Sequence, residues 1–294
     1  MASRIPPLLD TYLRLPPETS LVLLSGVLGS TTNWLLLRYL HSLLLSSTQP
    51  DPAAADAEAA GASTTVVLVS FLRDYAFWKD GAGKLGTDLD GLSKKARFVF
   101  VDGLTALFRT SVGASPQHSN GNGNGHGPGL KSSRALSAPT LQQLHKELQD
   151  AVAQIRRVTS EEQKIVLVAD QLDLLLAASG GDISSQQLRE TLLDIRENVH
   201  SAIVTVSADS PLITSQTTSL EKEHAAFAIS LAHDAHLTIG LRMLDTGTAR
   251  DVSGVLRIAQ GGAESSTTAA DVVEERELLY YVAGDGGVRV FERG

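Results

Sequence analysis

Residues 21–31 read LVLLSGVLGST and join an apolar run to a turn that contains two glycines. The run from Leu21 to Leu24 has the continuous apolar character of a strand buried on both faces of a sheet. The residues from Thr31 to Leu45 are apolar on most of a helix circumference, which predicts a deeply buried helix. A strand, a glycine-containing turn and a helix in this order form the junction at which backbone N–H groups bind phosphate.

Four more apolar runs follow this junction and alternate with helical patterns. They are near-continuous in Val, Ile, Leu or Phe, and they comprise Thr65 to Ser70, Phe98 to Val101, Lys164 to Ala169 and Ala202 to Ser207. The spacing of apolar residues predicts amphipathic helices over Thr140 to Val158 and Ser184 to Asn198. Buried strands that alternate with helices predict an α/β fold with a mostly parallel sheet flanked by helices.

The pattern changes after about Leu237. Short apolar runs are now separated by turns that contain Gly and Asp, and they cover Leu237 to Leu241, Val255 to Ile258, Leu278 to Val282 and Val288 to Phe291. Residues 283–287, AGDGG, tolerate positive φ and suit a hairpin turn. A parallel core with an antiparallel C-terminal extension is typical of RecA-like domains, although a Rossmann-type enzyme with an added hairpin would give a similar pattern.

The chain has 294 residues, of which 43% are hydrophobic, and no long linker divides it, so we expect a single domain over residues 1–294. Two low-complexity stretches, residues 49–63 and 111–137, predict flexible surface insertions because repeated Gly, Ala and Pro make ordering entropically costly. Residues 261–270, GGAESSTTAA, suggest a third and shorter loop that joins two strands.

Composition narrows the setting in which the protein works. Cysteine is absent, which fits a reducing compartment, and no segment reads as a secretory signal or as a membrane span. We therefore expect a soluble cytoplasmic protein with no membrane partner, and whether it also enters the nucleus stays open. The formal net charge of −8 opposes sequence-independent nucleic-acid binding by the chain alone.

The turn after the first strand lacks the lysine that a working phosphate loop, the Walker A motif, requires. With Gly29 as the second glycine of the motif, Ser30 stands at the lysine position and Thr31 at the magnesium-ligating hydroxyl. Starting from Gly26 instead, the Gly-Lys-Ser/Thr positions hold Thr31, Thr32 and Asn33. The Gly-Lys pair within residues 81–85 follows no strand, so we expect no phosphate there.

Two apolar runs end in a carboxylate that could orient magnesium, and they end at Asp170 and Asp102. An aspartate in this place is as often a helix cap or a turn residue. The run Thr65 to Ser70 has no carboxylate after it until Asp74, so the acid that would activate water is missing. We therefore expect no hydrolysis by this chain alone and no cofactor, while nucleotide binding without hydrolysis stays open.

A cluster of histidines could suggest a metal site. His233 and His236 are spaced by one helical turn, with His224 upstream, but a strand is predicted to begin at Leu237, which makes shared ligation awkward. We expect ordinary packing or capping roles for these histidines and no metal.

Residues 233–258, HDAHLTIGLRMLDTGTARDVSGVLRI, resemble the C-terminal signature of Elongator complex subunit 6. In that family a His-x-x-His-Leu strand precedes a Gly-x-x-Arg-Asp-Val-x-Gly-x-Leu-Arg-Ile hairpin. The segments Lys164 to Leu176 and Arg97 to Leu107, and the lysine-free turn Ser25 to Thr31, are also similar to the family. The resemblance covers most of the chain outside the low-complexity stretches.

The resemblance implies a RecA-like fold without working Walker motifs. It further implies a heterohexameric ring with Elongator subunits 4 and 5, in two copies each, that joins the catalytic Elongator subcomplex. This ring contacts transfer RNA and supports the addition of carboxymethyl-type groups to wobble uridine. A RecA-type domain offers its nucleotide face to a neighbour, so a chain with that face silenced can keep the contact as structure.

The matching signature makes Arg242, Arg250 and Arg257 candidates for an interface or RNA contact, although such charges often face solvent or pair locally. Residues 210–222 follow the fifth strand, where RecA-type proteins place a pore-facing loop, and Lys222 is the basic residue of that stretch. Two alternatives stay open: a stand-alone RecA-like nucleotide-binding protein or ATPase, and a Rossmann-type reductase, for which the first turn has only part of the glycine pattern.

Overall fold

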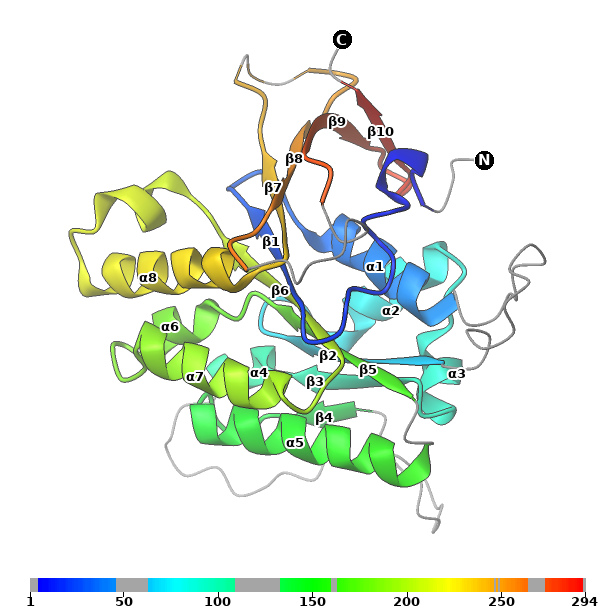
Figure 1. The fold of residues 1–294 in the computed structure, drawn as a ribbon, viewed down its shortest axis with the longest axis vertical. Coiled ribbons are helices and arrows are strands. Elements are labelled where there is room, and N and C mark those ends of the chain that lie inside the picture. Colours follow the sequence, from blue (N-terminus) through cyan, green and yellow to red (C-terminus); the bar gives the residue numbers. More distant parts are fainter. Residues whose placement is uncertain are drawn as a thin grey trace.

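A computed structural model describes residues 5–45, 63–108, 133–159, 163–245, 247, 249–263 and 273–292. Its centre is a ten-stranded sheet with the order β10-β9-β8-β7-β1-β6-β5-β2-β3-β4. Helices cover both faces of the parallel part, and the last strands extend beyond it (Figure 1). The predicted class, an α/β fold with a mostly parallel sheet and an antiparallel C-terminal extension, is confirmed.

Seven parallel strands, β1 to β7, build the core of the sheet. Their bounds are β1 (Leu21–Gly26), β2 (Thr64–Ser70), β3 (Phe98–Asp102), β4 (Ser133–Ala135), β5 (Lys164–Asp170), β6 (Ser201–Ser207) and β7 (Leu237–Arg242). β1 lies between β6 and β7 and pairs in parallel with both. The central strands are buried along almost their whole length, as their continuous apolar composition predicts.

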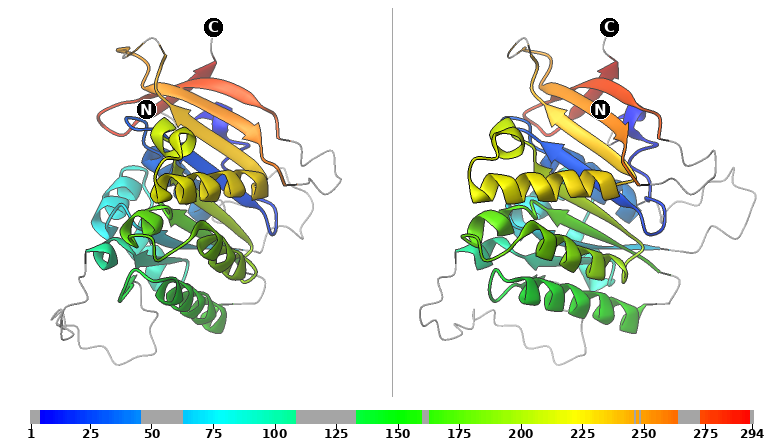
Figure 2. Two further views of the ribbon diagram at one scale, coloured as in Figure 1. Left: turned by 90° about the vertical axis from the view of Figure 1, so that its left-hand side faces the viewer. Right: turned by 60° about the vertical axis from the view of Figure 1, so that its left-hand side comes forward.

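Helices divide between the two faces of the sheet (Figure 2). The helices of eight residues or more are α1 (Asn33–Leu45), α2 (Tyr75–Lys84), α5 (Leu141–Val158), α7 (Ser185–Arg196) and α8 (Ser219–Asp234). Shorter helical segments are η1 (Pro7–Leu9), α3 (Leu89–Lys94), α4 (Leu104–Leu107), α6 (Leu174–Ala178) and η3 (Pro211–Ser215). Hydroxyl caps begin several of them, and Ser184 and Thr218 each form a full capping box.

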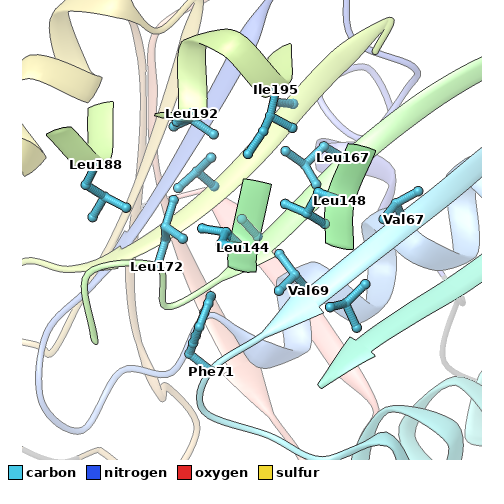
Figure 3. Close-up of a cluster of buried hydrophobic side chains, with 14 of the residues drawn as sticks. Val67, Val69, Phe71, Leu144, Leu148, Leu167, Leu172, Leu188, Leu192 and Ile195 are labelled. Atoms are coloured by element: carbon cyan, nitrogen blue, oxygen red, sulfur yellow. The ribbon is translucent and has the colours of Figure 1, made fainter. Parts of the chain in front are cut away.

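The strands β1, β2, β3, β5 and β6 each contribute to two separate hydrophobic cores. Leu21 and Leu23 of β1 pack in the core under α5, α7 and α8, whereas Val22 and Leu24 pack in the core under α1 and α2. This division follows from the alternation of side chains along a strand. Figure 3 shows the first core, where leucines of α5 and α7 meet the valines of β2.

The C-terminal extension is an antiparallel meander. β8 (Gly254–Gln260) pairs with β7, β9 (Arg276–Val282) pairs with β8, and β10 (Val288–Glu292) pairs with β9. The predicted hairpin turn over 283–287 joins the last two strands, and Gly286 there has a φ of 84°. The segment between β8 and β9 is the predicted joining loop, of which residues 264–272 lie outside the described residues.

The structure corrects two predictions about segments between strands. The insertion predicted over 111–137 is wrong at its end, because Ser133–Ala135 form the edge strand β4 and Leu136 is fully buried. Residues 49–62 and 111–132 lie outside the described residues. The stretch predicted as a loop over 210–222 contains η3 and the start of α8, so it is only partly a loop.

No helix in the described part of the chain is long and apolar enough to cross a membrane.

The packing of α5 on the sheet leads to a stability prediction. Leu148 is 2% exposed and lies among the leucines and valines that Figure 3 labels. Leu148→Ala should lower the free energy of unfolding by about 2 to 5 kcal/mol, because it leaves a cavity in a close-packed core. Chemical denaturation measures this loss, and Lys146→Ala on the exposed face of the same helix is the control. Equal effects of the two changes would contradict the described packing.

Candidate functional site at the carboxyl ends of the parallel strands

The candidate site lies where the carboxyl ends of β1, β2, β5 and β6 meet. In open α/β sheets ligands bind at the carboxyl ends of the strands, at the point where the connections from two neighbouring strands run in opposite directions. β1 lies at this point, because the chain continues from it to β2 on one side while β7 lies on the other. The turn after β1 joins it to α1, as predicted.

The turn of residues 26–31 is compact and closes on itself. A Cβ atom on Gly26 would lie 2.5 Å from the carbonyl oxygen of Ser30, so a side chain there would collide with backbone. Gly29 has a φ of 89°, which L-residues rarely adopt, and a Cβ there would lie 3.1 Å from Sδ of Met243. The Ser30 side chain is buried, and the Thr31 hydroxyl accepts a hydrogen bond from the Asn33 N–H at 3.2 Å.

Three backbone N–H groups of this turn are already bound to acceptors within the chain. The Val27 N–H donates to the Leu241 carbonyl at 3.3 Å, and the Ser30 N–H donates to the Val27 carbonyl at 2.8 Å. The Leu28 N–H donates to Oδ1 of Asp209 at 2.6 Å. In a phosphate loop such groups face the ligand instead. Here the Asp209 carboxylate of the chain itself accepts one of these N–H groups in place of a bound phosphate.

Asp209 follows β6 and was not among the predicted site residues. Its backbone neighbour Ala208 donates an N–H to the Gly26 carbonyl at 2.8 Å, so the chain after β6 runs beside the turn. The carboxylate therefore places a negative charge at the turn, and it would repel a phosphate group that approached the same amides. Three N–H groups of the turn thus have acceptors within the chain, and one of these acceptors is a carboxylate.

Asp170, the predicted magnesium-orienting residue, is at the end of β5 but is completely buried. Its carboxylate accepts hydrogen bonds from Oγ of Ser70 at 2.8 Å and from Oγ1 of Thr205 at 3.2 Å. Burial raises the pKa of Asp170 to about 6, although the two hydroxyl groups oppose the rise. These contacts tie together the ends of β2, β5 and β6.

A second buried carboxylate, Asp173, lies close to His224 of α8. Oδ2 of Asp173 accepts the Ser207 N–H at 3.2 Å and lies 3.7 Å from Nδ1 of His224. The other ring nitrogen of His224 is 2.8 Å from the Ser207 carbonyl oxygen. Burial raises the pKa of Asp173, and His224 opposes the rise. His224 thus packs against the sheet end, and Asp173 is a site residue that sequence reasoning missed.

The two other carboxylates considered from sequence accept N–H groups at the starts of helices. Asp74 accepts the Phe77 N–H at 2.9 Å at the start of α2, and Asp102 accepts the Thr105 N–H at 2.9 Å at the start of α4. At the end of β2 stands Ser70, whose hydroxyl binds Asp170. Among the described residues no three His, Asp or Glu side chains group so as to hold a metal ion.

The predicted interface arginines lie in the C-terminal meander. Arg242 ends β7 and forms ion pairs with Asp245 at 2.8 Å and with Glu277 at 3.4 Å. Arg257 of β8 is exposed and faces Glu277 across the strand pair, so Arg242 and Arg257 share one face of the sheet. Arg250 is exposed in the connection between β7 and β8.

Lys222 is exposed in the second turn of α8, so it lies on a different element from the arginines of the C-terminal meander. The structure therefore brings Arg242 and Arg257 together and leaves Lys222 on a separate helix. Lys222 was predicted to lie in a loop, but the capping box at Thr218 starts a helix before it.

Solved structures with the same architecture support the fold class. A KaiC-like protein from the hyperthermophilic archaeon Pyrococcus horikoshii OT3 superposes with a TM-score of 0.53 at 14% identity, covering 99% of this chain and 98% of that chain. An uncharacterised protein from Pyrococcus horikoshii, solved with an unknown peptide, gives a TM-score of 0.58 at 10% identity and covers 100% of both chains. Together with the strand order, these likenesses define a RecA-like α/β protein.

The sequence comparisons narrow this class to a family. The family model described as Elongation complex protein 6 matches residues 60–282. The Elongator complex protein 6 homolog of Schizosaccharomyces pombe is 22% identical over 289 residues, covering 97% of this chain and 96% of that relative. The chain belongs to the Elongation complex protein 6 family, and the resemblance read from its C-terminal signature is confirmed.

The buried Asp170 carboxyl gives a prediction for stability against pH. Its pKa in the folded chain, about 6, is above the 3.8 of an ordinary aspartate, so the folded state holds this proton more tightly than the unfolded state. Ionising Asp170 therefore costs stability as the pH rises from about 4 to about 7, by roughly 3 kcal/mol at most. The variant Asp170→Asn, which cannot ionise, should gain stability relative to the native chain over that range.

Urea denaturation at a series of pH values measures this difference. The variant Asp194→Asn is the matched control, because it removes an exposed carboxylate by the same change. A difference between Asp170→Asn and the native chain that stays constant from about pH 4 to about pH 7 would show that the carboxyl is not held as described.

Proposed function

We propose that this chain is a non-catalytic RecA-like subunit of the Elongator complex. In this proposal it forms a heterohexameric ring with subunits 4 and 5, and the ring supports transfer RNA binding during wobble-uridine modification by the catalytic subcomplex. Family membership supports a role as an Elongator accessory subunit. The ring, its partners and its RNA substrate are inferred from the family resemblance and from the features below.

The observation that carries the non-catalytic role is the closed turn after β1. It has no lysine, and the Leu28 N–H is bound by Asp209 at 2.6 Å. Phosphoryl transfer depends on positioned positive charge around the phosphates, and this turn has no lysine to supply it. Asp170 lies at the expected strand end, but its oxygens are bound by Ser70 and Thr205.

Exposed apolar side chains at the same edge support assembly through this face. Leu28 is 88% exposed after β1, Phe108 is 78% exposed beyond β3, and Leu72 is exposed after β2. These side chains follow strands at separate positions along one edge of the sheet, and each offers apolar surface to a neighbouring protein. The edge that would bind nucleotide in a motor protein is therefore suited to contact a neighbouring subunit.

The charge distribution supports RNA binding by an assembly and not by this chain alone. A net charge of −8 repels a polyanion, so the exposed Arg250 and Arg257 would need basic residues of other subunits beside them. In our proposal they extend a basic surface that is completed in the ring.

The composition of a co-expressed complex tests the proposed role most broadly. We expect this chain to co-purify with subunits 4 and 5 as a particle whose mass equals two copies of each, measured by native mass spectrometry. A chain that remains a stable monomer in the presence of both subunits would contradict the proposal, and it would favour the alternative of a stand-alone RecA-like protein.

A substitution at Leu28 tests which edge makes the contact. Leu28→Asp should weaken assembly by about 30-fold or more, because a central apolar side chain often contributes about 2 kcal/mol to binding. Its thermal unfolding should change little, since the side chain is exposed in the monomer. Val158→Asp is the matched control, with a side chain 53% exposed on α5, beside the amino end of β5. Equal assembly of both variants would place the contact elsewhere.

A further inference from the structure

The segment of residues 208–218 joins β6 to α8, and it begins directly after Ser207, the last residue of β6. The Ser207 N–H donates to Oδ2 of Asp173 at 3.2 Å, and the Ser207 carbonyl oxygen lies 2.8 Å from Nε2 of His224. The Ser207 hydroxyl donates to Oε1 of Gln171 at 2.9 Å. Side chains from two other parts of the chain therefore bind all three polar groups of this residue.

His224 connects the two ends of this segment. It lies in α8, whose capping box at Thr218 ends the segment, and it contacts Ser207, which precedes the segment. Most side chains between these ends are exposed, although Ile213 packs partly against the core. A stretch with few buried contacts is the kind of region that opens locally, so its attachment at Ser207 decides how firmly it is held.

Asp173 and His224 form a buried pair at this attachment. Each is 3% exposed, and Oδ2 of Asp173 lies 3.7 Å from Nδ1 of His224. A carbonyl oxygen only accepts hydrogen bonds, so Nε2 of His224 carries a hydrogen and Nδ1 is the nitrogen that faces the carboxyl group. One proton then neutralises the pair, whether the carboxyl group or Nδ1 holds it.

The charges around the pair leave this neutral state the favourable one. Asp170, at the end of β5, is the other buried carboxyl group here, and Arg73 after β2 is the cation that acts on it. Glu223 of α8 accepts an N–H at the start of α7. The elements α6 and β6, which border the pair, carry no titratable side chain. Asp173 and His224 therefore depend on each other for charge balance.

Raising the pH removes the proton that neutralises the pair. Burial raises the pKa of Asp173 above its ordinary 3.8, and His224 opposes the rise. With a raised pKa in the folded chain, the stabilisation is complete at low pH and is lost as the pH rises through that pKa. Without the proton, a carboxylate faces the lone pair of Nδ1 in a buried site, which is unfavourable.

We propose that Asp173 and His224 form a proton-dependent latch on residues 208–218, which holds Ser207 while the pair carries its one proton and releases the segment when that proton is lost. Release would also withdraw Asp209 from the Leu28 N–H, because Asp209 follows Ser207 by two residues. The latch would thus control whether the turn after β1 is closed. The inference does not depend on ring assembly, because every group involved belongs to this chain.

Hydrogen exchange of the isolated full-length chain, followed by mass spectrometry at about pH 6 and about pH 8, tests the latch. After correction for the intrinsic effect of pH on exchange, peptides from residues 208–218 should exchange about tenfold faster at the higher pH. Peptides from β2 should change far less, because that strand lies in the centre of the sheet. Equal corrected exchange of residues 208–218 at the two pH values would overturn the proposal.

Three variants separate the latch from a general effect of pH. In Asp173→Asn the amide can donate to Nδ1 and its oxygen can still accept the Ser207 N–H without a titrating proton, so exchange should stay slow at both pH values. His224→Leu removes the contact with Ser207 and should make the segment exchange fast at both. His233→Gln changes an exposed histidine of α8 and should behave as the native chain does. A pH dependence that persists in Asp173→Asn, or slow exchange in His224→Leu, would contradict the latch.

Discussion

The structure depends on how the backbone N–H groups at the end of β1 are satisfied. A buried or half-buried N–H needs an acceptor, and a motor protein leaves that role to nucleotide phosphates. Here Asp209 accepts the Leu28 N–H at 2.6 Å, and carbonyl groups of the chain accept those of Val27 and Ser30. These three N–H groups therefore have acceptors within the chain, and the Leu28 side chain is 88% exposed.

The same principle extends along the edge of the sheet. Asp170 accepts hydrogen bonds from hydroxyl groups at the ends of β2 and β6, and Asp173 lies against His224 of α8. At this edge the carboxylates of Asp170 and Asp173 accept hydrogen bonds from groups of the strands themselves. An edge closed by internal polar contacts and bordered by exposed apolar side chains is suited to stable contact with another protein.

Much of the fold could be predicted because its strands are continuous apolar runs, and the predicted run Leu21 to Leu24 falls inside the observed β1. The helix α2 could not, because two glycines interrupt it and only Trp78 and Ala82 are buried, too few to show a stripe. β4 is three residues long and carries no apolar signal. The lysine-free turn was recognised, but Asp209 lies 181 positions from Leu28, and no local pattern reports such a contact.

The central claim is that acceptors of the chain itself bind the N–H groups that would face a phosphate in a phosphate loop. Isothermal titration of the isolated chain with ATP and magnesium tests it directly, together with an assay for released phosphate. We predict no saturable heat up to millimolar nucleotide and no turnover, because the turn lacks a lysine and three of its N–H groups are already bound within the chain. A dissociation constant in the micromolar range, or steady hydrolysis by the pure chain, would contradict this account.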